Sequence, residues 1–308
     1  MTKIATRDAY GEALAQLGEE IKDIVVLDAD LSGSTKTSVF AKKFPERFFN
    51  VGIAEQNLMG TAAGFATCGK IPFASTFAVF ATGRAFEQVR NSICYPKLNV
   101  KIAATHAGLT VGEDGATHQS VEDLSLMRAL PNMTVISPAD AVETKKAVMA
   151  AAFHQGPVYI RLGRMAVETI FDEDYEFEIG KGKVLREGSD VAIIATGIMV
   201  AEALRAAEIL EKEGINAMVV NIHTLKPIDE DIILKAADCG AIVTAEEHTV
   251  IGGLGSAVAE VLAEKKPTPM RRIGIKDRFG LSGKPNELLK LYNLTAEDIA
   301  DAAREVKR

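Results

Sequence analysis

Short runs of apolar, often β-branched residues alternate along the chain with longer segments of helical periodicity. In the first half, the runs predicted as strands are 24–27, 48–51, 71–74, 100–104, 134–136 and 157–160. The segments predicted as helices are 6–20, 55–68, 78–94, a segment from about 121, and 139–154. Strands that alternate with helices in this way are typical of parallel sheets covered by helices.

The alternation weakens between residues 163 and 188, which are acidic and aromatic and have little apolar periodicity. It resumes with predicted strands 191–195, 217–221 and 241–245 and predicted helices 199–213, 229–238 and 254–264. We therefore predict an α/β fold of two domains, each a mainly parallel sheet flanked by helices. The first domain spans 1–185, including a linker from about 163, and the second spans 186–308.

Composition and charge narrow the class of protein. Of 308 residues, 47% are hydrophobic, which is enough for two cores. The net charge is -7 and no Lys/Arg-rich run occurs, so we expect no nucleic-acid partner. Apolar stretches end well short of the roughly 20 residues that span a bilayer, so we expect no membrane partner. No apolar signal region precedes the first predicted helix, which reads as amphipathic.

The cysteines and glycines add two exclusions. Cys68, Cys94 and Cys239 lie far apart without a CxxC pair, which argues against a disulfide scaffold or cysteine-based zinc site and favours a cytoplasmic location. Residues 252–255 (GGLG) lack the third glycine of a dinucleotide fingerprint, because Val258 stands there. They are better interpreted as a helix start that allows close packing.

Polar residues gather where the first-domain strands are predicted to end. The segments are 28–34, 52–57 and the glycine-rich loop 105–119. Open α/β sheets bind ligands at the carboxyl ends of their strands, and a loop of about 15 residues usually has a function. We therefore place the candidate site at this edge of the first sheet.

Taken singly, each of these residues also has a purely structural interpretation. Glu55 is compatible with a first-turn acid that complements the helix dipole, and Phe77 and Phe80 with a core pair one turn apart. His106 and His118 are compatible with structural loop histidines. A metal site is not predicted, because the two histidines lack helical i, i+4 spacing and cysteine support.

Three segments in combination resemble the pyrimidine-binding domain of the transketolase family. They are VGIAEQNLMG at 51–60, STFAVF at 75–80 and ATHAGLTVGEDGATHQ at 104–119. The joint occurrence of THxGxxxGEDGxTHQ and an upstream GIAEQ is highly specific. The resemblance continues through residues 130–140 and the second domain, and so covers essentially the entire chain.

The resemblance implies thiamine diphosphate as the cofactor. Glu55 then shares a proton with N1' of the pyrimidine, which lets the cofactor's own amino group act as base. Phe77 and Phe80 supply the aromatic wall, and Asp30 lies beside the cofactor at a subunit interface. A further aromatic position of some transketolases is Gly83 here, so this wall is expected to be thinner.

The resemblance also assigns a sugar-phosphate substrate. The positions expected at its phosphate end are Arg7, Ser34, His106 and Arg164. Asp114 matches the residue that reads a sugar hydroxyl, and His118 matches one that lines the reaction centre. The catalytic residues implied are thus Glu55, His118 and His106.

One family feature is absent from this chain. Transketolases bind the diphosphate and its metal through a GDG motif followed 25–30 residues later by Asn, and the nearest match here, 113–115, begins with Glu. The chain therefore resembles the separately encoded C-terminal subunit of a split transketolase. We expect Mg²⁺ or Ca²⁺ to be held mainly by an N-terminal partner subunit, in an α2β2 assembly.

The function implied is transfer of a two-carbon ketol unit from a ketose phosphate to an aldose phosphate. A 1-deoxy-D-xylulose-5-phosphate synthase is the nearest alternative, but it usually carries PRG where residues 161–164 read RLGR. The β subunit of a 2-oxoacid dehydrogenase E1 lacks the THxGxxxGEDG loop. A non-catalytic regulatory chain would have no chemical need for Glu55. Neither the preferred sugar nor a role for the second domain follows from the sequence.

Overall fold

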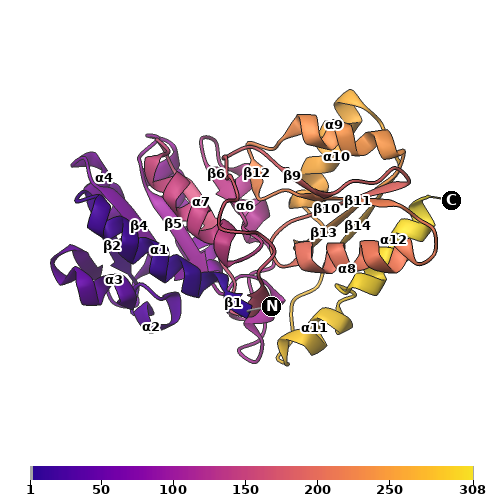
Figure 1. The fold of residues 1–308 in the computed structure, drawn as a ribbon. Coiled ribbons are helices and arrows are strands. Elements are labelled where there is room, and N and C mark those ends of the chain that lie inside the picture. The colour runs from indigo at the N-terminus through magenta and orange to yellow at the C-terminus, as the bar shows by residue number, and fades with distance from the viewer. Residues whose placement is uncertain (1–2, 308) are drawn as a thin grey trace.

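The computed structural model describes residues 3–307, whose strands form two large sheets, one built mainly from the first half of the chain and one from the second (Figure 1). The first sheet has the strand order β12-β6-β7-β5-β4-β2-β3. Its members are β2 (Ile24–Asp28), β3 (Phe48–Asn50), β4 (Ile71–Phe77), β5 (Lys101–Thr105), β6 (Thr134–Ile136), β7 (Val158–Arg161) and β12 (Thr224–Lys226). All pair in parallel except β12, which runs antiparallel to β6.

Helices cover both faces of this sheet, so its central strands are buried throughout. The α-helices of the first half are α1 (Thr6–Glu20), α2 (Ser32–Thr35), α3 (Ser38–Lys43), α4 (Glu55–Thr67), α5 (Phe86–Gln88), α6 (Asp123–Ala129) and α7 (Ala141–Phe153). The 3₁₀ turns are η1 (Pro45–Arg47) and η4 (Leu109–Val111).

The predicted continuous helix over 78–94 is wrong in detail. Two wide π-helical segments, η2 (Phe80–Arg84) and η3 (Val89–Cys94), flank the single turn α5. The wide turn η2 holds Phe80 and Arg84 at its two ends, with the Arg84 guanidinium 4.5 Å from the centre of the Phe80 ring. Such π turns occur frequently at functional sites.

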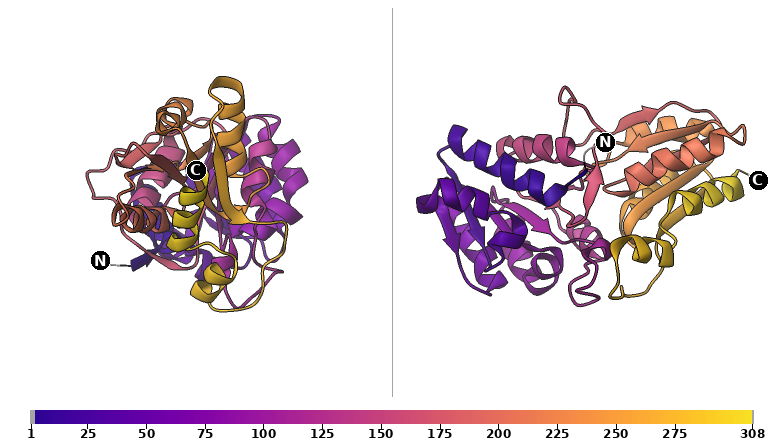
Figure 2. Two further views of the ribbon diagram at one scale, coloured as in Figure 1. Left: turned by 90° about the vertical axis from the view of Figure 1, so that its right-hand side faces the viewer. Right: turned by 60° about the horizontal axis from the view of Figure 1, so that its bottom comes forward.

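The second sheet has the order β14-β13-β10-β11-β9. Its parallel strands are β10 (Val191–Ala195), β11 (Ala217–Asn221), β13 (Ile242–Thr249) and β14 (Met270–Ile275), and β9 (Lys183–Arg186) is antiparallel. Helices on its two faces are α8 (Met199–Glu211), α9 (Glu230–Ala236), α10 (Leu254–Lys265) and α12 (Ala296–Val306), with the 3₁₀ turn η5 (Ala237–Cys239) after α9 (Figure 2). The short helix α11 (Pro285–Leu291) packs instead against η4 of the first half. The expectation of an α/β fold with two mainly parallel sheets is confirmed.

The segment expected as a linker contains regular structure. β8 (Ala166–Glu168) pairs with β1 (Lys3–Ala5), which precedes the first predicted helix, and β9 joins the second sheet. The partners of these strands lie far away in sequence, so local periodicity did not reveal them. Because β9 begins at Lys183, we propose that the boundary expected near 185 lies just before this strand.

Candidate active site

The loops expected to form the site meet at one edge of the first sheet. They follow β2, β3, β4, β5 and β7, which are parallel neighbours and therefore end at the same edge. Asp28 organises the first of these loops from a fully buried position. Its carboxylate accepts hydrogen bonds from Leu31 N at 2.6 Å and from the hydroxyls of Thr35 and Thr37.

Four aromatic and imidazole rings form a contiguous surface at this edge. Phe77 stacks on His106 with ring centroids 3.8 Å apart, and on Phe80 at 6.0 Å. His118 packs edge-on against Phe80 at 5.6 Å. Phe77 is buried, whereas Phe80 and His118 are half-buried. The interpretation of Phe77 and Phe80 as only a core pair therefore does not account for the face that they share with both histidines.

Glu55 lies beside this ring surface. It is the first residue of α4, its side chain is 2% exposed, and its Oε2 accepts a hydrogen bond from Arg84 Nη1 at 2.8 Å. The same guanidinium lies over the ring of Phe80. Sequence reasoning missed Arg84, although its place one turn beyond Phe80 was a signal that could have pointed to it.

His106 has a defined tautomer. Its Nε2 lies 3.2 Å from Arg7 Nη1, and its Nδ1 lies 2.9 Å from Thr105 Oγ1. A guanidinium only donates hydrogen bonds, so Nε2 is the acceptor and Nδ1 carries the proton. Burial, assisted by the positive charges of Arg7 and Arg164, lowers the pKa of His106 to about 3. The imidazole is therefore neutral near pH 7.

The basic side chains expected at the substrate end lie around this histidine. Arg7 also donates to the main-chain carbonyl of Ser34 at 3.1 Å, and burial lowers the pKa of Arg7. Arg164 forms ion pairs with Asp114 at 3.7 Å and Glu113 at 3.8 Å, and bonds the carbonyl of Val111. Arg164 thus links the end of the first sheet to the loop 105–119.

Asp30 occupies a different place from the ring surface. It lies after β2, is exposed, has a positive φ of 65°, and exchanges hydrogen bonds with Asn50, whose side chain lies at the end of β3. The contacts of Asp30 therefore connect two strand ends, and its proximity to a cofactor stays a prediction.

Across 3–307, no group of three or more His, Cys, Asp or Glu side chains is arranged to hold a metal ion. In the same range, none of the helices has the length and apolar character needed to cross a membrane.

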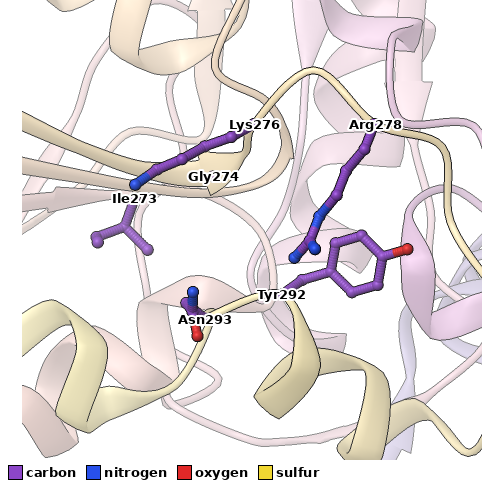
Figure 3. Close-up of a pocket in the computed structure, with 6 residues that line it drawn as sticks. All are labelled: Ile273, Gly274, Lys276, Arg278, Tyr292 and Asn293. Carbon is purple, nitrogen blue, oxygen red and sulfur yellow. The ribbon is translucent and has the colours of Figure 1, made fainter.

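A separate pocket lies in the second domain, at the end of β14 (Figure 3). It is lined by Ile273, Gly274, Lys276, Arg278, Tyr292 and Asn293. The Arg278 guanidinium lies 4.0 Å from the centre of the Tyr292 ring and donates to Leu291 O at 3.0 Å. The site residues predicted from the sequence lie elsewhere, so the edge of the first sheet remains the candidate site.

Two protein families match the chain in tandem. The transketolase pyrimidine-binding domain matches residues 2–169, and the transketolase C-terminal domain matches residues 180–299. Together the two matches cover nearly the whole chain.

Individual relatives match over the same length. A Methanocaldococcus jannaschii protein assigned as a transketolase C-terminal section is 58% identical over 302 residues, which cover 97% of this chain and 95% of the relative. The 6-deoxy-6-sulfo-D-fructose transketolase subunit of Clostridium sp. (strain MSTE9) is 48% identical over 301 residues, covering 97% and 94%.

A solved structure agrees with these matches. It is a split-gene transketolase in the form of an inactive β4 tetramer, and it superposes with a TM-score of 0.93 at 63% sequence identity. The similarity covers 99% of this chain and all of the other chain.

Proposed function

This chain belongs to the transketolase family, and on that premise we propose that it is the C-terminal subunit of a split, thiamine diphosphate-dependent transketolase. The reaction would move a two-carbon ketol unit from a ketose phosphate to an aldose phosphate. The observation that carries the proposal is the placement of Glu55, a carboxylate 2% exposed beside the surface formed by Phe77 and Phe80. A buried carboxylate next to a flat aromatic wall suits a protonatable heteroaromatic ring.

These residues fit the pyrimidine end of the cofactor. When bound, thiamine diphosphate supplies a thiazolium carbon that acts as the nucleophile. In the proposed site Glu55 holds a proton at N1' of the pyrimidine, and Phe77 and Phe80 hold the ring plane. Because Arg84 already occupies Glu55 Oε2, the ring nitrogen would share this carboxylate with Arg84 or displace it.

The diphosphate end does not find a matching metal-ligand group among residues 3–307. We therefore assign Mg²⁺ or Ca²⁺, together with the diphosphate, mainly to an N-terminal subunit in an α2β2 assembly. The description of the split-gene relative as an inactive β4 tetramer supports this division of the active site between unlike chains.

The substrate would enter over the two histidines. We propose that Arg7, Arg164 and the neighbouring Ser34 and His106 receive its phosphate, since guanidinium groups suit phosphate oxygens. Arg164 is at present paired with Asp114 and Glu113, so a phosphate would compete with these carboxylates. Asp114 would then be available to a sugar hydroxyl, and His118 would line the reaction centre.

The basic side chains at this end of the site also bear on the class of substrate. The Clostridium relative is named for a sulfonated sugar, which supports a ketose with an anionic end group as the donor. Arg7 and Arg164 suit either a phosphate or a sulfonate end.

We also propose a cytoplasmic location for the protein. Its three cysteines are free and one of them is exposed, which favours a reducing compartment.

The experiment combines this chain with a candidate N-terminal subunit that carries a GDG diphosphate-binding motif, to be sought first in the neighbouring reading frame. We expect no ketol transfer and weak thiamine diphosphate binding by the chain alone, and activity from the mixture in the presence of Mg²⁺. Glu55→Gln should lower kcat of the mixture by about 10²–10⁴-fold, the usual cost of losing an acid–base group. Calorimetric titration of the cofactor and coupled assays of the sugar products measure both effects.

Glu87→Gln is the matched control, because Glu87 is exposed on α5 and bonds Gln88 and Asn91. It should leave kcat unchanged. Tight cofactor binding and ketol transfer by this chain alone would refute the split-enzyme proposal, and a Glu55→Gln mixture with the kcat of the native mixture would refute the role of Glu55.

A further inference from the structure

The loop 105–119 is held by the second domain as well as by the first. Leu109 in this loop is fully buried within the apolar core of the second domain, in the same cluster as Leu288 of α11. Gln119, at the end of the loop, donates from Nε2 to Leu281 O at 2.9 Å. The loop that carries His106 and His118 is thus an interdomain element.

Glu247 makes the polar contact at the centre of this arrangement. It lies on β13, its side chain is 2% exposed, and its Oε1 accepts a hydrogen bond from the main-chain N–H of Thr110 at 2.6 Å. Gly108 passes so close that a Cβ at this position would overlap the Glu247 carboxylate. The φ of Gly108 is +80°, so glycine satisfies both the space and the backbone conformation here.

A buried cation of the first domain balances this carboxylate. Arg161, at the end of β7, donates to Glu247 O at 2.9 Å, and its Nη1 lies 3.9 Å from Glu247 Oε2. Its Nε also bonds Asp123 Oδ2 at 2.9 Å, and Tyr159 donates to the same oxygen. Removing one member of such a network leaves buried charged or polar groups without partners, which is costly.

We propose that Glu247 is a positioning residue, through which the second domain sets the main chain of residues 105–119 and hence the place of His106 at the substrate end. This role gives the second domain a part in the site, for which the sequence offered no candidate. The kinetic consequences rest on the proposed function, whereas the effect on the loop does not.

Hydrogen–deuterium exchange on the full chain tests the positioning directly. Glu247→Ala removes the acceptor of Thr110 N–H, so peptides from 105–119 should exchange about tenfold faster or more. Peptides from α4 should exchange as in the native chain. Glu247→Gln keeps one side-chain oxygen that can accept from Thr110 N–H, so exchange of 105–119 should accelerate less than in Glu247→Ala. This second variant still tests the proposal if the alanine variant does not fold.

The neighbouring Glu246 provides a matched control. It is equally buried on β13, but its carboxylate accepts from Leu254 N and Gly255 N at the start of α10. Glu246→Ala should therefore loosen α10 and leave 105–119 unchanged. Native exchange of 105–119 in Glu247→Ala, or equal acceleration in both alanine variants, would overturn the proposal.

Kinetics with the partner subunit separate positioning from a general loss of structure. Glu247→Ala should raise KM for the ketose phosphate about tenfold or more, while the thiamine diphosphate concentration for half-activation changes less than about twofold. A parallel rise in both values would contradict a role at the substrate end. If the mixture shows no ketol transfer but the exchange result holds, the positioning stands and the proposed function fails.

Discussion

At the scale of single residues, the energetic problem of the site is a buried carboxylate. An ionised carboxylate removed from water is costly unless a cation or several donors compensate it. The charge of Glu55 is compensated by Arg84, whose side chain is half exposed. The Arg84 guanidinium also lies over the face of the Phe80 ring. Arg84 therefore supplies the hydrogen bond and the opposite charge that compensate the buried carboxylate of Glu55.

This pair predicts a specific coupling of stabilities. Arg84→Met should lower the free energy of unfolding by about 1–2 kcal/mol, less than for a fully buried pair because solvent already reaches the guanidinium. In a Glu55→Gln background the same change should cost much less, because no buried charge is left behind. Urea unfolding of the four chains measures the coupling.

The control for this double-mutant cycle of Glu55 and Arg84 is Arg90→Met, which removes an exposed guanidinium that bonds Asn91. It should have little effect in either background. Equal costs of Arg84→Met with and without the Glu55 carboxylate would show that the ion pair contributes nothing to stability.

At the scale of elements, the N-terminus of α7 anchors the linker between the sheets. Asp140 caps the helix by accepting from Glu143 N at 2.8 Å, and its other oxygen accepts from Ile170 N and Phe171 N. Glu143 accepts from Tyr175 of the linker and from Asn221 at the end of β11. One helix start thus fixes a segment that has little apolar periodicity of its own.

Asp140→Ala should both destabilise the chain and release the linker. Loss of the cap and of two buried acceptor contacts is expected to cost about 1–3 kcal/mol, and limited proteolysis should cut within 163–182. Thr295→Ala is the control, because Thr295 caps α12 without touching the linker. It should lower stability and leave the linker resistant; a linker equally resistant in both variants would contradict the anchoring role of Asp140.

At the scale of the whole molecule, buried acids connect the two sheets and make stability depend on pH. Burial raises the pKa of Glu143 to about 8 and that of Glu247 to about 7. Both values lie above 4.5, the pKa of a glutamate in the unfolded chain. At a pH between 4.5 and the folded pKa, the folded chain therefore binds more protons than the unfolded chain. The stability gained from protonation is therefore present at low pH and lost as the pH rises through 7 and 8.

These two acids lower the denaturation midpoint between pH 6.5 and 8, whereas Lys101, whose pKa burial lowers from 10.5 to about 7, opposes this fall above pH 7. Glu143→Gln should make this fall shallower, because one of the two groups no longer titrates. Asn221 Oδ1 has no hydrogen-bond partner, so its amide is free to turn and accept from the new side-chain NH₂. Glu176→Gln, an exposed neighbour of Tyr175, should retain the native slope. A slope unchanged by Glu143→Gln would contradict the assignment.

The pH range is chosen because buried histidines act only on the acid side. Burial lowers the pKa of His106 to about 3 and that of His223 to about 4, below the unfolded 6.5. Their contribution to stability is present above pH 6.5 and is lost as the pH falls. Above pH 6.5 the histidines therefore contribute little to the slope, which depends on the buried acids and on Lys101, and the difference between Glu143→Gln and Glu176→Gln isolates the share of Glu143.

The sequence by itself determined the elements whose hydrophobic period is local. The parallel strands other than β14, most helices and the two-domain order follow from apolar runs, and the loop 105–119 and Glu55 follow from a family motif. β14 was not predicted, because its first half is exposed and basic and offers no apolar run. The strands β8, β9 and β12 could not be predicted from apolar runs, because their pairing partners come from distant parts of the chain.

Only the tertiary structure decided which charges meet. Arg84 reaches Glu55 across 29 residues, and Glu247 reaches Thr110 across 137. Neither pair has a local spacing that periodicity could detect, because the approach is set by how the sheets stack and not by the neighbours along the chain. Local pattern thus specifies which face of each element is buried, whereas the partners of buried charges depend on the packed arrangement of both domains.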